Sequence, residues 1–276
     1  MNRLVVLLDF SPYTPTQLRL ACSWQEIFNL DLVFVHKMDG IAPTLPISNK
    51  KEINEIIEFN KKESNTKFLK CLEEGALSPD SNKTSFEAVS SQLAHFLEGF
   101  LKPNDIVLLG LKGTGFLKKI LIGSTATTLI NHLNHLIIAV PHTIDNTVPR
   151  KLVLSCQEKH PVNETALDAI LKTVGKEIKE IELLTIIENK KELESSNQYL
   201  EQMRSKLGGG YKYKISIYEN KDAFGEIKMR FSKCLDDFIV LQKGSRNLDD
   251  KLFRRFFIND LIHDGNTPLI ILPTPD

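Results

Sequence analysis

Asp105-Ile106-Val107-Leu108-Leu109-Gly110-Leu111-Lys112-Gly113 is the stretch of sequence that decides the fold. Its apolar run is typical of a parallel strand that is buried on both faces. Glycines follow at positions 110, 113, 115 and 123, and a helix-like segment begins near Thr125. Glycines let the backbone approach a ligand closely, and the free N–H groups at a helix N-terminus attract anions. The stretch therefore predicts a phosphate-binding loop between a strand and a helix.

Strands alternate with helices on both sides of this loop. Helical spacing of apolar residues separates the short apolar runs, as in the segment 91–100. Such alternation predicts an α/β fold with a doubly wound parallel sheet. The strands expected in this first part of the chain are 3–8, 31–36, 84–89, 105–109 and 136–140.

The same pattern starts again after a polar segment, 142–149, which is interpreted as a linker. Self-similarity on this scale indicates two copies of one domain rather than a solenoid of small units. The sequence thus predicts two tandem domains, 1–142 and 150–276. The matched runs are 105–109 with 237–241 and 137–141 with 269–273, at one constant offset, and 3–6 with 151–154, at a larger offset.

The two copies differ at the residues that suit a ligand. Small and acidic residues of the first copy are replaced in the second, whereas the apolar strands persist. Arg255 and Phe256 would fill the space that a phosphate needs, so only the first copy is expected to keep a ligand site. The opposed pairs are Asp9 and Gln157, Gly110 and Gln242, Gly113 and Ser245, Gly123 and Arg255, and Ser124 and Phe256.

Three phosphate-loop patterns can be tested on the first copy. The Walker A pattern fails because Phe116 and Leu117 stand where lysine and serine or threonine are required. The dinucleotide pattern GxGxxG fails because Lys118 occupies its last glycine position, and because the loop follows the fourth strand rather than the first. The pattern Gly-x2-Gly-x9-Gly-[Ser/Thr] fits without deviation. Its residues are Gly110, Gly113, Gly123 and Ser124.

This last pattern resembles the phosphate loop of ATP-binding universal stress proteins. Asp9 and Ser11, after the first strand, resemble that family's adenine-side segment, and Val35 resembles its adenine-contacting residue. The residues that resemble its ribose and phosphate loop are Gly110, Gly113, Gly123, Ser124 and Thr125.

The resemblance also implies an architecture. Each half would be a five-stranded, Rossmann-like parallel sheet of the adenine nucleotide α-hydrolase type, with strand order 3-2-1-4-5. Members of the family form dimers through strand five. The two halves of one chain would mimic such a dimer by pairing 136–140 with 269–272, and tandem chains could pair further as homodimers.

The function expected from this resemblance is a stress-response regulator that binds ATP, AMP or ADP, with or without magnesium, in its first half. No nucleophile with an assigned base stands out, so the chain is not expected to be an enzyme beyond weak ATP hydrolysis. An alternative is a nucleotide-independent module that binds another protein through the pseudo-dimer surface. An ATP-pyrophosphatase-type ligase ranks last, because the segment 9–13 lacks the glycines of that class.

Composition narrows the partners and the location. Lys and Arg number 35, as do Asp and Glu, so charge gives no reason to expect nucleic acid or a membrane surface as a partner. The four cysteines are far apart and no apolar run reaches about 18 residues, which predicts a cytoplasmic protein. His132 and His135 lack a third metal ligand, so no metal site is expected. The sequence names neither the stress nor the protein partner.

Overall fold

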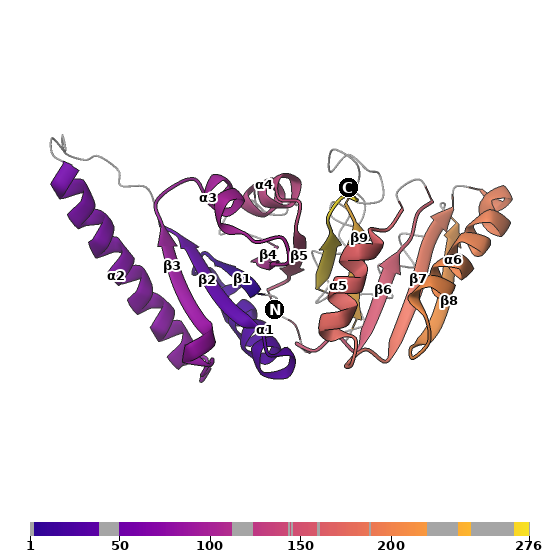
Figure 1. Ribbon diagram of the computed structural model, residues 1–276, viewed down its shortest axis with the longest axis horizontal. Coiled ribbons are helices and arrows are strands. Elements are labelled where there is room, and N and C mark those ends of the chain that lie inside the picture. Colours follow the sequence, from indigo (N-terminus) through magenta and orange to yellow (C-terminus); the bar gives the residue numbers. More distant parts are fainter. Residues whose placement is uncertain are drawn as a thin grey trace.

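The computed structural model consists of one ten-stranded sheet with helices on both faces (Figure 1). It describes residues 3–38, 50–111, 124–142, 144, 146–158, 161–187, 189–219, 237–243 and 268–275. Its strands are β1 (Arg3–Leu8), β2 (Asp31–Lys37), β3 (Thr84–Val89), β4 (Ile106–Gly110), β5 (Leu136–Val140), β6 (Lys151–Ser155), β7 (Glu180–Ile187), β8 (Lys212–Glu219), β9 (Asp237–Gln242) and β10 (Leu269–Leu272).

The strand order is β3-β2-β1-β4-β5-β10-β9-β6-β7-β8. Neighbouring strands run parallel except β5 and β10, which pair antiparallel with Ile138 opposite Ile270. The predicted α/β class with a mostly parallel sheet is confirmed. The strands are continuous within a single sheet, and the β5–β10 pairing joins the two halves of the sequence.

The central strands are apolar along their whole length because both of their faces are covered. In β1, Leu4 and Val6 belong to one core and Val5 and Leu7 to the other, and all four are buried. Continuous apolar runs of this kind are typical of parallel strands with helices on both faces. The same reason explains why these strands could be located from the sequence.

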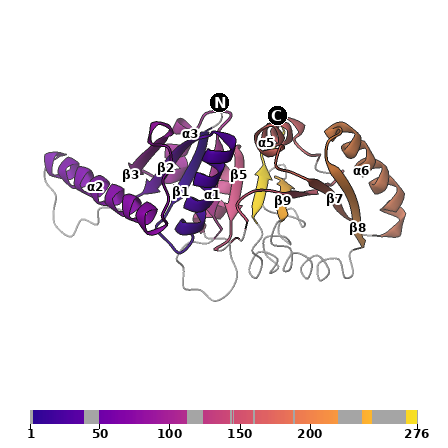
Figure 2. The ribbon, with the colours of Figure 1, turned by 90° about the horizontal axis from the view of Figure 1, so that it is seen from below.

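Six α-helices lie within the described residues, in two layers. Residues of α1, α2, α5 and α6 pack into the core on one face of the sheet, and residues of α3 and α4 pack into the core on the other. Figure 2 shows α2 and α6 at the two outer ends of the molecule. Their bounds are α1 (Thr14–Phe28), α2 (Lys50–Glu74), α3 (Leu93–Phe100), α4 (Ser124–His132), α5 (Glu164–Val174) and α6 (Leu193–Leu207); the 3-10 turns are η1 (Ser81–Lys83) and η2 (Lys190–Glu192).

Local sequence explains the helix ends. Pro15 stands in the first turn of α1, where its missing N–H costs nothing, and Asn29 closes that helix with a left-handed φ of 55°. Asn163 caps α5, because its side chain accepts from the backbone N–H of Ala166 at 3.0 Å. Among the described helices, none combines the length and apolar character that crossing a membrane requires.

Both cores contain residues of the two halves, and Trp24 lies in one of them. Trp24 of α1 is fully buried and stacks on Phe238 of β9, with ring centroids 6.5 Å apart. Its indole N–H donates to the carbonyl of Thr147 at 2.7 Å, which ties the segment between the halves to α1. A second tie is the hydroxyl of Thr16, which donates to the carbonyl of His142 at 2.6 Å. The junction is therefore packed side chain against side chain as well as hydrogen-bonded through the sheet.

Candidate functional site

The carboxyl ends of the first-half strands lie at one edge of the sheet. β1 lies between β2 and β4, and β4 lies beside β5, all parallel, so the residues that follow them share this edge. Ligands of open α/β sheets bind outside the carboxyl ends of the strands, at the point where the strand order reverses. Here that point lies between β1 and β4, where Asp9 and Gly110 stand.

The segment after β1 is held in shape by its own side chains. The Asp9 carboxylate accepts from the backbone N–H of Ser11 at 3.0 Å, and the Ser11 hydroxyl accepts from the N–H of Tyr13 at 3.2 Å. Phe10 takes a left-handed φ of 51°, which is rare for a bulky residue. Its ring packs on His36 of β2, with centroids 4.4 Å apart. Asp9 thus has a structural role in the turn, and its side chain remains exposed at the edge.

Gly110 is required by packing as well as by any ligand. A Cβ atom at this position would lie 3.0 Å from Cβ and 3.2 Å from Cγ of Tyr13. The Tyr13 ring also meets His142 edge-on, with centroids 5.6 Å apart. Burial, and then the nearby Asp9 charge, raise the pKa of the Tyr13 hydroxyl. Tyr13, Gly110 and His142 therefore form one contact cluster at this edge.

Two buried oxygens lie close to this cluster in the sequence. Thr14 Oγ1 and Gln17 Oε1 have no hydrogen-bond partner among the described residues, while Gln17 Nε2 donates to the carbonyl of Leu7 at 2.7 Å. Both side chains are almost fully buried. Buried oxygens normally accept a hydrogen bond from protein, water or ligand, so this part of α1 is suited to receive a donor.

The other predicted site residues are placed as follows. The side chain of Val35 is 1% exposed and belongs to the core, so only its backbone could meet a ligand. Thr125 is exposed in the first turn of α4. Ser124 begins α4, and its side chain is outside the described part of the structure, as are Gly113, Gly123 and the loop lysines Lys112, Lys118 and Lys119.

The equivalent edge of the second half is filled by its own side chains. Gln242 stands opposite Leu272 of β10, just as Gly110 stands opposite Val140 of β5. Its Oε1 accepts from the backbone N–H of Asn163 at 2.7 Å, and its Nε2 donates to the carbonyl of Pro273 at 2.8 Å. The Asn163 amide also donates to Pro273, at 3.3 Å. A ligand at this place would have to displace a hydrogen-bonded network.

Of the two histidines considered for a metal, His132 contacts a carboxylate and His135 has a buried ring nitrogen. His132 Nε2 contacts a carboxylate oxygen of Glu98 on α3 at 2.6 Å. Nδ1 of His135 is buried and has no hydrogen-bond partner within the described ranges. No group of three histidine, cysteine, aspartate or glutamate side chains in the described part of the chain could hold a metal ion.

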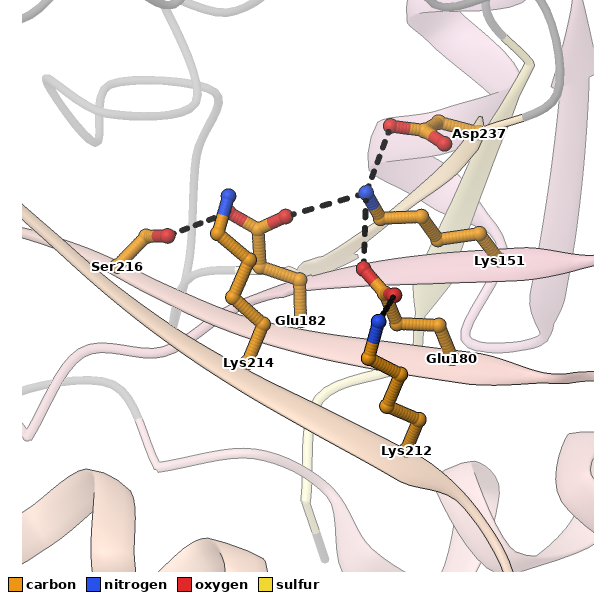
Figure 3. Close-up of polar contacts among 7 residues, drawn as sticks. All are labelled: Lys151, Glu180, Glu182, Lys212, Lys214, Ser216 and Asp237. Atoms are coloured by element: carbon orange, nitrogen blue, oxygen red, sulfur yellow. Dashed lines mark hydrogen bonds and ion pairs between the residues drawn. The ribbon is translucent and has the colours of Figure 1, made fainter.

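A cluster of charged side chains crosses β9, β6, β7 and β8 at their N-terminal ends (Figure 3). Lys151 lies at its centre, at 3.1 Å from Glu180, 3.4 Å from Glu182 and 3.6 Å from Asp237. Glu182 is fully buried and also accepts from the Ser216 hydroxyl at 2.6 Å. The remaining cations are Lys212, 3.5 Å from Glu180, and Lys214, 3.5 Å from Glu182.

This cluster is built for stability rather than for a ligand. Three ammonium groups face three carboxylates, so their charges balance. The cluster lies at the amino ends of its strands, opposite to the carboxyl ends where α/β sheets bind ligands. The first half has a smaller counterpart, in which Arg3 binds Asp105 at 2.5 Å and donates to the carbonyl of Phe100. The sequence analysis did not identify it, although the repeat aligns Arg3 with Lys151 and Asp105 with Asp237.

The charged cluster predicts a stability that declines at both ends of the pH scale. Burial opposes ionisation of Glu180, but Lys151 and Lys212 outweigh it and lower the pKa. Its contribution is present above the unfolded value of about 4.3 and is lost as the pH falls through the folded pKa. Burial likewise opposes the Lys151 charge, but Asp237, Glu180 and Glu182 raise its pKa. That contribution is present below about 10.4 and is lost as the pH rises through the folded pKa.

Urea unfolding measured from acid to alkaline pH would check this dependence. The wild-type protein is expected to lose free energy of unfolding at both ends. The double variant Lys151→Met, Glu180→Gln should show a flatter profile, because it lacks the two groups whose pKa shifts cause this dependence. Parallel profiles for the two proteins would contradict the assignment.

The fold is similar to solved structures of universal stress proteins. A universal stress protein from Archaeoglobus fulgidus matches with a TM-score of 0.64 and 14% identity, over 99% of this chain and 97% of the other. A functionally unknown protein from Pseudomonas aeruginosa PAO1 matches with a TM-score of 0.52 and 11% identity, over 99% and 92%. The cytoplasmic domain of a prokaryotic cation chloride cotransporter matches with a TM-score of 0.53 and 11% identity, over 99% and 95%.

No protein-family model and no curated protein sequence matches the chain. At these identities the likeness to solved structures shows the fold alone. The chain therefore has the universal stress protein fold over its whole length, as the resemblance noted in the sequence suggested.

Proposed function

We propose that the chain binds an adenine nucleotide, ATP or else AMP or ADP, at the carboxyl edge of its first half and acts as a regulatory protein in a stress response. In this proposal the two halves take the place of the two subunits of a dimer, and only the first keeps its ligand site. The protein would work in the cytoplasm with a protein partner, and would bind neither nucleic acid nor membrane.

The difference between Gly110 and Gln242 is the observation that carries the proposal. The two residues occupy the same register in equivalent strand pairs. In the second half, Gln242 and Asn163 form hydrogen bonds across this place, so a ligand there would have to displace them. In the first half the same position has no side chain of its own and is packed by Tyr13, and the exposed Asp9 follows the neighbouring strand β1. This asymmetry supports one site per chain.

The residues divide between two ends of the nucleotide. Asp9, Ser11 and the backbone of Val35 would face adenine. Thr125 lies in the first turn of α4, where backbone N–H groups and the helix dipole favour a phosphate. Gly110, Gly113, Gly123 and Ser124 would line the ribose and the phosphates, with magnesium bound through the nucleotide. No side chain is assigned a catalytic role, and hydrolysis would be weak at most.

Calorimetric titration with MgATP and with AMP, for the wild-type protein and two variants, tests the proposal. Gly123→Arg copies the second half, where Arg255 stands at this place, and is expected to weaken binding by about a hundredfold or more because the side chain fills the phosphate space. Gly209→Arg is the matched control, because Gly209 lies in an exposed turn with no atom within 4 Å of a Cβ. It should bind as the wild type does.

Absence of both heat and thermal stabilisation with the wild-type protein would refute nucleotide binding. Equal affinities for the wild type and Gly123→Arg would refute the location of the site.

A nucleotide-independent interaction module is the second candidate. Contact with Tyr13 explains why residue 110 is glycine without any ligand. The likeness to the cytoplasmic domain of a cotransporter adds that this fold also occurs as an accessory domain of another protein. Capture of a protein partner that is indifferent to MgATP and to Gly123→Arg would favour this function over the first.

A further inference from the structure

The C-terminal end of α4 is held by a side chain from the second half. Nζ of Lys243, which follows β9, donates to the carbonyl of Asn131 at 2.8 Å and to that of Leu133 at 3.1 Å. The last carbonyls of a helix have no partner within the helix, and a cation there also interacts favourably with the helix dipole. Lys243 is half-buried, and burial lowers the pKa of its ammonium group. The contact thus combines charge, two hydrogen bonds and partial exclusion of water.

A second contact from the same half holds the turn after α4. Oδ1 of Asn134 accepts from the backbone N–H of Thr274 at 2.9 Å and from its hydroxyl at 2.8 Å. Within the first half, Glu98 of α3 binds His132, the last residue of α4, at 2.6 Å. The end of α4 is therefore fixed mainly from across the junction between the halves.

Lys243 directly follows Gln242, the residue whose side chain fills the carboxyl end of the second-half strands. Gln242 crosses that edge, and its Nε2 donates to the carbonyl of Lys243 at 3.0 Å as well as to that of Pro273. The equivalent dipeptide of the first half is Gly110-Leu111, which can do neither. A single polar dipeptide of the second half thus fills its own site and holds a helix of the other half.

The opposite end of α4 is the proposed phosphate end. The helix has nine residues, Ser124 to His132, and spans about 13 Å. Helices this short are marginal alone, and ordering one end favours order along the whole helix. A contact that fixes the C-terminal carbonyls should therefore also favour the arrangement of N–H groups at Ser124 and Thr125 that an anion needs.

We infer that the second half sets the nucleotide affinity of the first half through α4, with Lys243 as the positioning residue. The inference rests on the proposed function, because it concerns the affinity of that same site. By linkage, the effect is reciprocal: a nucleotide at the N-terminal end strengthens the hold of Lys243 on the C-terminal end. The second half, whose own site is filled, thereby acts as a regulatory domain of the first.

The test compares the wild type with Lys243→Met, Lys243→Arg and the control Lys176→Met, which removes an exposed ammonium from the same half. Hydrogen exchange of the α4 amides is measured without nucleotide, and MgATP affinity by calorimetry. Lys243→Met should exchange about tenfold faster in α4 and bind MgATP about three- to tenfold more weakly, because the methionine stem fills the same space without donors or charge. Lys243→Arg should restore both, and Lys176→Met should change neither.

Each outcome bears on a stated claim. Unchanged exchange in α4 of Lys243→Met overturns the inference, and so does faster exchange with unchanged MgATP affinity, since the contact would then be merely structural. Urea unfolding of each variant shows whether faster exchange results from a loss of overall stability. Such a loss would speed exchange throughout the chain and not in α4 alone. Wild-type protein that binds no MgATP overturns the proposed function, and with it the control of affinity, even where exchange in α4 depends on Lys243.

Discussion

Replacement of Lys151 by methionine is expected to lower the free energy of unfolding by about 3–5 kcal/mol. Among the described residues, Lys151 is the one cation that contacts Glu180, Glu182 and Asp237 together. Glu182 is fully buried and Asp237 is 4% exposed. Removal of the ammonium leaves these carboxylates in a place where water cannot replace it well. Breaking a buried ion pair on one side is costly for this reason, even where the intact pair contributes little.

The structure offers a matched control for this prediction. Lys212→Met removes a cation from the same row, but the Lys212 side chain is 80% exposed, and within the described part of the chain its ion pair is with Glu180 alone. Exposed ion pairs contribute about 0–1 kcal/mol, so this variant should stay close to the wild type. Urea unfolding followed by far-ultraviolet circular dichroism at neutral pH would measure both. A cost for Lys151→Met no larger than that for Lys212→Met would show that the cluster is already open to water.

The charged cluster also shows why the burial of some charged residues could not be predicted from the sequence. Glu180 and Glu182 alternate with apolar residues in β7, a pattern that normally indicates a solvated face. Here the alternation is real, but Lys151 and Lys214 on the two neighbouring strands cover Glu182 completely. Burial of a charge depends on partners supplied by other strands, and a single segment does not contain that information.

Much of the fold could be predicted because the apolar runs in the sequence coincide with the strands that are buried in the structure. The runs in β1, β4 and β5 are apolar throughout, since helices cover both faces of the central sheet. Helix ends are less local: α4 ends at His132, where Lys243 donates to the carbonyl of Asn131 in the helix and to that of Leu133 just after it. That end is fixed by the second half rather than by a local capping residue.

The candidate site was predicted from the spacing of its glycines. That spacing carries no information about the residues that pack around the site. Tyr13 packs on Gly110, so this position requires a residue without a side chain even in the absence of a ligand. The closure of the second half by Gln242 and Asn163 was predicted only as a loss of small residues. Both facts depend on residues that meet from strand ends and helix starts far apart in the sequence, so they follow from tertiary packing and not from a motif.

Replacement of Trp24 by alanine is expected to cost about 4 kcal/mol and to destabilise the whole chain rather than its first half alone. The indole is fully buried, donates to Thr147, and packs against Phe28 at 5.4 Å and Phe238 at 6.5 Å between ring centroids. Because Phe238 belongs to β9, the cavity would open in the core that both halves share. Unfolding of the wild type should therefore be one cooperative transition, which the variant shifts as a unit.

Two further variants separate the contributions to this effect. Trp24→Phe keeps an aromatic ring beside Phe238 but removes the donor to Thr147, and should cost about 1–2 kcal/mol. Ile27→Ala, on the same helix but 43% exposed, should cost less than about 1 kcal/mol. Urea unfolding followed by circular dichroism suits all of them, because Trp24 is the only tryptophan and fluorescence would be lost with it. Two separate transitions, of which Trp24→Ala shifts only one, would mean that the halves fold independently and that the shared core contributes little to joining them.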